Sequence, residues 1–202
     1  MNRTWRSARL LSVGIALLAA ACSSVLPPVS PPDGGPPVTC RIGFQPYVGG
    51  QMGFSSCFPT LWEVTETEGT GDGGRGVLFS EPAGDDPAAA KQIAVLIAPG
   101  EPGQSDPDLL EGFVIELFNR RVQLGLEAGT IETMTIDGRP GAEDSRVRRN
   151  VISPASGEVA EWVAGLAADG ELWTIHVSGP EASSNEIQSI YRQFLSALRL
   201  DM

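Results

Sequence analysis

Apolar and polar side chains alternate along two runs near the C-terminus, residues 158–168 and 171–178, and Asp169-Gly170 separates the runs. Asp-Gly is a favoured two-residue turn of β-hairpins. Counting outward from this turn matches apolar residues on one face: Leu166 with Trp173, Ala164 with Ile175 and Trp162 with Val177. The pattern predicts a hairpin with one buried side, and it places His176 beside Val163 on the opposite side.

Apolar residues recur at helical spacing in two longer segments. In residues 181–198 they form the stripe Ile187, Ile190, Tyr191, Phe194 and Leu198, and we expect Ser184 or Asn185 to cap this helix. In residues 107–124 the predicted apolar face consists of Leu110, Phe113, Val114, Leu117 and Phe118. Ser105 and Pro107 suit the start of this helix, and Gly125 and Gly129 suit its end.

Five further segments have the composition of β-strands: 61–67, 76–80, 92–98, 130–136 and 144–153. Asp137-Gly138 and residues 153–157 are expected turns, and the glycine-rich stretch 69–76 lacks the Lys-Ser/Thr of a phosphate-binding loop. The run from Ile93 to Ala98 is apolar on both faces, which predicts a central strand covered on both sides. The order of elements predicts an α+β fold, an antiparallel β-sheet with helices packed on its two faces.

The first 21 residues have a different pattern. Arg3, Arg6 and Arg9 precede an unbroken small and apolar run of about a dozen residues, shorter than the roughly 20 that a membrane-spanning helix needs. Residues 1–21 are therefore predicted to be an export signal. The sequence from Leu18 to Cys22 resembles the bacterial lipobox, although leucine stands one position earlier than usual. The resemblance implies that Cys22 is lipidated and becomes the first residue; the alternative is ordinary cleavage that leaves a free cysteine.

Residues 22–39 contain six prolines after the cysteine, which excludes a helix or a central strand. We expect a polyproline-II-like tether that spans about 50 Å at full extension. The alternative is a ligand for a proline-recognising domain. Residues 40–202 are predicted to form one globular α+β domain with an N-terminal disulfide hairpin.

Export would place Cys40 and Cys57 in an oxidising compartment, where an even pair is typical of a disulfide. Gly49-Gly50 suits a tight turn that brings the two cysteines nearly opposite, two residues out of register. Four large apolar side chains lie in or near this loop, and we consider them a candidate partner-binding surface: Phe44, Tyr47, Met52 and Phe54. The alternative is that they pack onto the sheet.

The formal net charge is −11, and removal of the three signal arginines takes it to −14. Such a domain repels phosphate backbones, so we expect no nucleic-acid partner. His176 is the single histidine and no CxxC motif is present, so we expect no metal, no cofactor and no catalytic residues. The acids considered for a hydrolase are Glu101, Asp106, Asp108, Glu111, Glu143 and Asp144. Arg146 and Arg148 share one face of a strand, where nearby acids are expected to balance them.

Five segments together resemble the PsbP-like family, which includes bacterial lipoproteins. They are the entry strand from Phe58 to Val64, the apolar strand from Ile93 to Ala98, the turn from Ile136 to Gly141, the strand from Gly170 to Ile175 and the C-terminal amphipathic helix. The resemblance covers residues 56–202 and implies an α/β/α sandwich. It also implies a non-enzymatic binding, assembly or accessory role and offers no catalytic residues.

Together these features predict an exported lipoprotein at the cell membrane or outer membrane, facing the periplasm or the exterior. We expect a non-catalytic protein that reaches the membrane through its lipid and binds or assists another envelope protein. Two alternatives stay open. A roomy apolar cavity between helix and sheet would support a carrier of a small apolar or lipid ligand, and two carboxylates facing each other across a deep cleft would support an envelope hydrolase.

Overall fold

The computed structural model describes residues 38–67, 73–82, 90–125, 131–149 and 157–201, which all belong to one compact unit, Pro31–Met202. The predicted signal, Cys22 and the tether up to residue 37 lie outside the described residues. The same holds for Gly129 and for most of the expected turn at 153–157.

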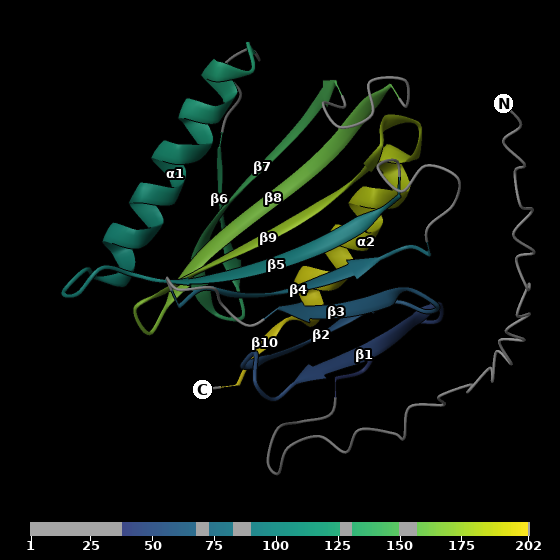
Figure 1. The fold of residues 1–202 in the computed structure, drawn as a ribbon, viewed down its shortest axis with the longest axis horizontal. Coiled ribbons are helices and arrows are strands. Elements are labelled where there is room, and N and C mark those ends of the chain that lie inside the picture. Colours follow the sequence, from purple (N-terminus) through teal and green to yellow (C-terminus); the bar gives the residue numbers. More distant parts are fainter. Residues whose placement is uncertain (1–37, 68–72, 83–89, 126–130, 150–156, 202) are drawn as a thin grey trace, which may run out of the picture. The chain divides into compact units, whose positions relative to one another are not determined.

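The described residues form a large and a small antiparallel sheet and two α-helices (Figure 1). The large sheet has the order β3-β4-β5-β9-β8-β7-β6, and the small sheet has the order β1-β2-β10. The large sheet consists of β3 (Glu63–Thr67), β4 (Arg75–Ser80), β5 (Gln92–Pro99), β6 (Glu132–Ile136), β7 (Arg139–Arg149), β8 (Glu158–Ala168) and β9 (Glu171–Pro180). The small sheet consists of β1 (Phe44–Gly49), β2 (Phe54–Pro59) and β10 (Arg199–Leu200), and the helices are α1 (Asp106–Gln123) and α2 (Ser184–Ala197).

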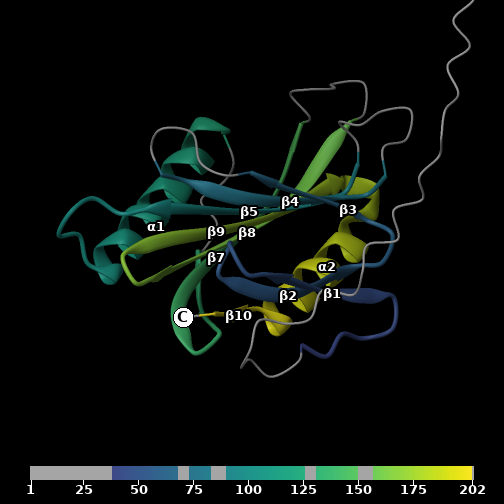
Figure 2. The same ribbon diagram turned by 60° about the horizontal axis from the view of Figure 1, so that its bottom comes forward.

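Helix α2 and the small sheet lie on one face of the large sheet, and helix α1 lies on the other (Figures 1 and 2). The main core fills the space between the large sheet, α2 and the small sheet. Its aromatic rings meet at Phe194 of α2, whose ring centroid is 6.4 Å from that of Phe54 and 5.7 Å from that of Phe79. A smaller cluster around Phe113 and Leu117 attaches α1. The predicted α+β fold with a helix on each face is confirmed.

Strands β8 and β9 form the hairpin that the alternating pattern predicts. Leu166 pairs with Trp173 and Val163 pairs with His176, as expected. Asp169 (φ 53°) and Gly170 (φ 77°) have the left-handed backbone of the turn that joins tightly paired strands. A two-residue turn fixes the register, so the whole ladder follows from it.

Strands β1 and β2 also form a hairpin, but its register differs from the prediction. Residues 50–53 form the turn and Gly49 pairs with Phe54, which sets Cys57 opposite Pro46 instead of near Cys40. The disulfide nevertheless forms, with the two Cα atoms 5.7 Å apart. A turn closed by the Phe44 N–H, which donates to the Arg41 carbonyl at 3.0 Å, brings Cys40 back to the ladder.

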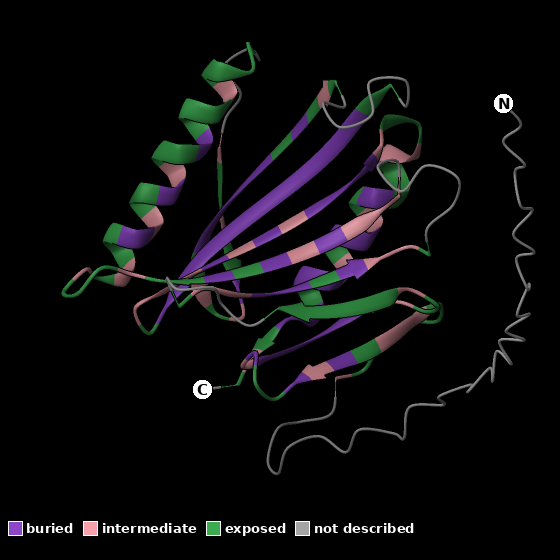
Figure 3. Ribbon diagram, viewed as in Figure 1, coloured by how far each residue is buried: buried purple, intermediate pink, exposed green. Residues whose placement is uncertain are grey.

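The prediction that β5 is covered on both sides is wrong. Ile93, Val95 and Ile97 are buried in the main core, whereas Leu96 on the opposite face is 57% exposed. Helix α1 lies over β7, β8 and β9 and does not reach β5. The strand covered on both faces is β8, in which all but the first residue are buried (Figure 3).

The two helices begin differently from each other. At α1, the Ser105 side chain accepts the Asp108 N–H and the Asp108 carboxylate accepts the Ser105 N–H, so a capping box closes the helix. At α2, neither of the predicted caps is used. The cap position is Ser183, which makes no side-chain capping bond, because a 3₁₀ turn at Glu181–Ser183 leads into the helix.

Strand β7 holds both helices through two consecutive acids, because neighbouring side chains of a strand point to opposite faces. Glu143 accepts a hydrogen bond from the Tyr191 hydroxyl of α2 at 2.7 Å and one from Arg192 at 2.9 Å. Asp144 points to the other face, where it binds Arg121 of α1. The strand begins earlier than predicted, directly after the expected Asp137-Gly138 turn.

Candidate functional site

An open groove of about 720 Å³ runs between helix α1 and the adjoining ends of β7 and β8. Most of its surface is apolar. One wall comes from the first half of α1, the other from the start of β7, and the floor from the end of β8. The lining residues are Asp106, Pro107, Leu110, Glu111, Val114, Ile115, Arg139, Pro140, Ala167, Ala168 and Asp169.

The groove exists because α1 touches the sheet along a single line of side chains. The Phe113 ring lies so close to Gly165 of β8 that a Cβ atom there would approach the ring to 2.3 Å. Leu109 also packs tightly, against Gly100. These two contacts hold the helix down on one side, and Leu110 and Val114 on its neighbouring side overhang β8 where it carries only alanine.

The outer surface of α1 continues the apolar wall of the groove. Ile115 is 52% exposed, Phe118 51% and Val122 62%. The prediction that Phe118 belongs to the buried face is therefore wrong. Leu109, which the predicted face did not include, is buried in its place. Exposed apolar side chains that adjoin a groove are typical of a binding surface.

The rim of the groove is acidic. Asp106 accepts a hydrogen bond from the Gly170 N–H at 2.8 Å, and Arg139 is paired with Asp137 at 3.1 Å. The side chains of Glu111 and Asp169 are exposed and make no hydrogen bond or ion pair within the described part of the chain. The rim thus carries three carboxylates and one guanidinium group.

The same face of the sheet holds a buried network of charged side chains. Glu161 accepts hydrogen bonds from Arg146 at 2.7 Å and from Arg148 at 2.5 Å, and its Oε1 lies 3.5 Å from Nε2 of His176. Burial by itself raises the pKa of Glu161, but the attraction of His176 and Arg146 outweighs burial and lowers the pKa to about 2. The expected acid is present, but the expectation that these arginines lie on a solvated outer face is wrong for Arg146, which is buried together with Glu161.

Of the acids considered for a hydrolase, Asp106 and Glu111 lie on the α1 wall of the groove. Asp108 belongs to the cap of α1, and Glu143 and Asp144 point to opposite faces of the sheet. Desolvation and the hydrogen bond to Glu143 raise the pKa of the Tyr191 hydroxyl, which keeps this donor protonated. In the described ranges, no three His, Cys, Asp or Glu side chains come together as a metal site.

Three of the four candidate partner-binding residues are core residues. Tyr47 is 7% exposed, Met52 1% and Phe54 0%, because the small sheet folds back onto α2 and the large sheet. These three side chains cannot contact a partner, so that hypothesis is wrong for them and the packing alternative holds. Phe44 is half-buried, and the guanidinium of Arg41 lies 4.5 Å from its ring centroid.

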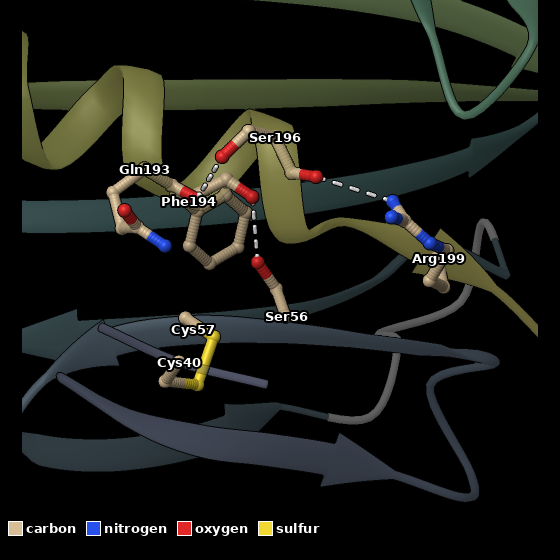
Figure 4. The surroundings of a disulfide bond; sticks show 7 residues. All are labelled: Cys40, Ser56, Cys57, Gln193, Phe194, Ser196 and Arg199. Carbon is tan, nitrogen blue, oxygen red and sulfur yellow. Dashed lines mark hydrogen bonds between the residues drawn. A yellow bond between two sulfur atoms is a disulfide. The ribbon is translucent and has the colours of Figure 1, made fainter. Parts of the chain in front are cut away.

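The disulfide lies at the small sheet, close to the C-terminal part of α2 (Figure 4). Cys57 is fully buried, and the neighbouring Ser56 hydroxyl donates to the Phe194 carbonyl of α2 at 2.7 Å. The predicted disulfide between Cys40 and Cys57 is confirmed. The bond ties the segment before β1 to β2 within the small sheet.

The sequence pattern predicted Leu110 and Val114 as apolar residues of α1 but did not indicate a groove. The sequence did contain one indication of it, the width of the apolar surface on α1. Residues 109–122 carry apolar side chains at too many positions for one stripe, namely 109, 110, 113, 114, 115, 117, 118 and 122. The sequence pattern of β7 and of the end of β8 did not indicate that these strands line a groove.

Neither of the two described α-helices is long and apolar enough to cross a membrane. The described residues thus form an α+β sandwich with an open apolar groove beside α1. No protein-family model matches the sequence, and no curated protein matches it significantly.

Solved structures do share this fold. The solution structure of cyanobacterial PsbP (CyanoP) from Synechocystis sp. PCC 6803 matches 83% of this chain and 98% of its own, with a TM-score of 0.55 and 14% sequence identity. The crystal structure of LpqN, which is involved in cell envelope biogenesis of Mycobacterium tuberculosis, matches 69% of this chain and 85% of its own, with a TM-score of 0.43 and 10% identity. At such identities the likeness to CyanoP is one of fold.

Proposed function

We propose that this chain is a non-catalytic binding protein of the cell envelope, anchored to a membrane by lipid on Cys22, and that it holds another envelope protein in the groove beside α1. The observation that carries the proposal is the groove itself, an open apolar surface of about 720 Å³ whose wall continues onto exposed residues of α1. The export signal and lipobox-like sequence support the location. The disulfide between Cys40 and Cys57 is in keeping with an oxidising compartment.

The positions of the acids support a binding role over hydrolysis. A glycosidase needs two carboxyl groups facing each other across the substrate. Here Asp106 and Asp108 serve the start of α1, and Glu143 and Asp144 attach the two helices. Each of these four acids thus has a structural partner. Glu111 has none, but it lies on the same α1 wall of the groove as Asp106, and we assign catalysis to none of the five.

A second candidate function is the carriage of a small apolar or lipid ligand. Pockets for such ligands measure about 300–1,000 Å³ and are lined mainly by apolar side chains. The groove has this volume and this lining, and it lies between helix and sheet. Protein partner and apolar ligand would therefore compete for one site, and the same experiment separates them.

Photo-crosslinking in living cells tests the proposal. A photoreactive amino acid replaces Ile115 in the groove or, as a control, Ile42, which is fully exposed in the segment before β1. We expect a defined protein adduct from position 115 and none from position 42. An adduct of lipid mass at position 115 would favour the second candidate, and equal labelling from both positions would contradict the groove as the binding site.

A further inference from the structure

We infer that the groove beside α1 receives an apolar protein segment that carries a lysine or arginine next to its apolar residues. The inference rests on the proposed function and specifies the chemistry of the partner. It combines two features of the groove, an apolar floor and wall that take the apolar residues and an acidic rim that takes the cation.

The floor and wall can bury several side chains of an extended segment. Ala167 forms the floor, beside Ala168, whose methyl group points into the main core, and Leu110, Val114 and Ile115 form the wall on α1. Phe118 and Val122 follow along the helix at the spacing of one turn, so the apolar surface extends past the end of the groove. An occupant longer than a small molecule is needed to cover both parts.

The rim determines the charge of the occupant. Glu111 stands on α1 and Asp169 in the β8–β9 turn, and both carboxylates are exposed without a partner in the described residues. Arg139 is already bound by Asp137, and the Asp106 carboxylate accepts the Gly170 N–H. A cation beside the apolar anchor would pair with Glu111 or Asp169, whereas an anion would be repelled.

The charge also argues against the other occupants of an apolar groove. A second copy of this chain brings the same negative charge to the contact, since the mature protein carries about −14. A fatty acid or an anionic phospholipid would set its head group against the acidic rim. A basic and apolar protein segment satisfies both features of the groove.

A random twelve-residue peptide library displayed on phage tests the inference while the natural partner is unidentified. The target is the mature chain as cells produce it, held in phosphatidylcholine nanodiscs. We expect the selected peptides to combine large apolar residues with Lys or Arg, and the best of them is then labelled for fluorescence polarisation. Selection of acidic or purely apolar peptides, or of no peptide, would overturn the inference.

Two pairs of variants then show whether binding uses the groove and its charge. Ile115→Asn should weaken binding of the labelled peptide at least tenfold, while Leu96→Asn, a comparably exposed change on β5 outside the groove and its extension along α1, should have less than a threefold effect. The double variant E111Q/D169N should weaken binding about three- to tenfold, since each lost surface ion pair counts modestly. Asparagine is suited to position 169 because it tolerates the positive φ there.

The control for charge is E116Q/E132Q, which removes two exposed carboxylates outside the groove. If E111Q/D169N and E116Q/E132Q have equal effects, the rim has no specific role and the inference fails. Tight binding of the fluorescent fatty acid cis-parinaric acid that Ile115→Asn abolishes would show that the groove binds a lipid. That result would contradict the inferred protein segment. In either case a position-115 crosslink in cells would still support a binding role for the groove, so the two proposals fail separately.

Discussion

Glu161 is buried on the α1 face of β8, and two arginines and His176 surround it. Its folded pKa of about 2 lies below the value of 4.5 for a free glutamate. Folding therefore favours the ionised form, and the resulting stabilisation is complete above pH 4.5 and is lost as the pH falls toward 2. The contribution is about 3 kcal/mol.

We predict that the free energy of unfolding, measured with urea between pH 7 and pH 2.5, falls as the pH drops below about 4.5. Glu161→Gln should be less stable at pH 7 by about 3 kcal/mol, because the buried Arg146 loses its nearer carboxylate and keeps only Asp144, at 3.6 Å. The free energy of unfolding of this variant should also fall less between pH 4.5 and pH 2.5 than that of the wild type. A wild-type protein whose stability is flat down to pH 3 would contradict this prediction.

At the level of single residues, the sequence allowed some assignments and hid others. Two cysteines in an exported chain were enough to predict their disulfide. The roles of Tyr47 and Phe54 could not be read in the same way, because an aromatic residue in a glycine-rich hairpin suits a surface or a core equally well. The cluster around Glu161 was hidden because its members come from three different strands.

Helix α1 depends on a close approach between Phe113 and Gly165. We predict that Gly165→Ala destabilises the protein by about 1–3 kcal/mol, because the added Cβ overlaps the ring and forces the helix away from the sheet. Thermal unfolding and amide exchange of α1 measure the two effects. The control is Gly112→Ala on the exposed side of the same helix, where a Cβ meets no atom within 4 Å.

Gly112→Ala should stabilise the protein by about 0.5–1 kcal/mol through helix propensity alone. If both glycine variants are equally stable, the helix is not held by the contact at Gly165. Loss of the groove in Gly165→Ala, read out as loss of the position-115 crosslink, would link this contact to function.

The disulfide ties the segment before β1 to β2, with a sequence separation of 17 between its cysteines. We predict that C40A/C57A loses about 3 kcal/mol of unfolding free energy, chiefly because the unfolded chain regains freedom. Urea titration of oxidised wild type, reduced wild type and the variant gives the comparison. Equal midpoints for oxidised and reduced protein would show that the bond contributes nothing.

The two hairpins show which part of an element the sequence can specify. Asp169-Gly170 permits one tight turn, so the register of β8 and β9 follows from local chemistry. Between β1 and β2 the glycines are spread over several positions, and the turn forms over residues 50–53 instead of at Gly49-Gly50. The packing of Met52 and Phe54 in the core selects that turn, and packing is not visible in a local pattern.

For the molecule as a whole, we predict that Cys22→Ser moves the protein out of the membrane fraction, while the neighbouring Ser23→Ala leaves it there. The reason is that the lipid is expected on the thiol of residue 22. Mass spectrometry of the mature protein provides the direct measurement. A first residue other than Cys22, or a Cys22 without acyl chains, would refute the anchor.

At this scale the fold class followed from the sequence, whereas the groove did not. The order of strands and helices is enough to predict an antiparallel sheet with a helix on each face. The groove depends on where α1 crosses the sheet, and that position is fixed by Gly165 and Gly100, which lie outside the helix. The position of α1 also explains why Leu96 on β5 is exposed, because the helix does not cover that side chain.

The adjacent acids of β7 have a consequence for how this protein can evolve. Glu143 secures α2 and Asp144 secures α1, and the alternation of the strand is what sends them to opposite sides. Deleting one residue between Gly141 and Glu143 would exchange the two sides and detach both helices in one mutational event. Natural variants that differ in length should therefore place their insertions and deletions outside this strand.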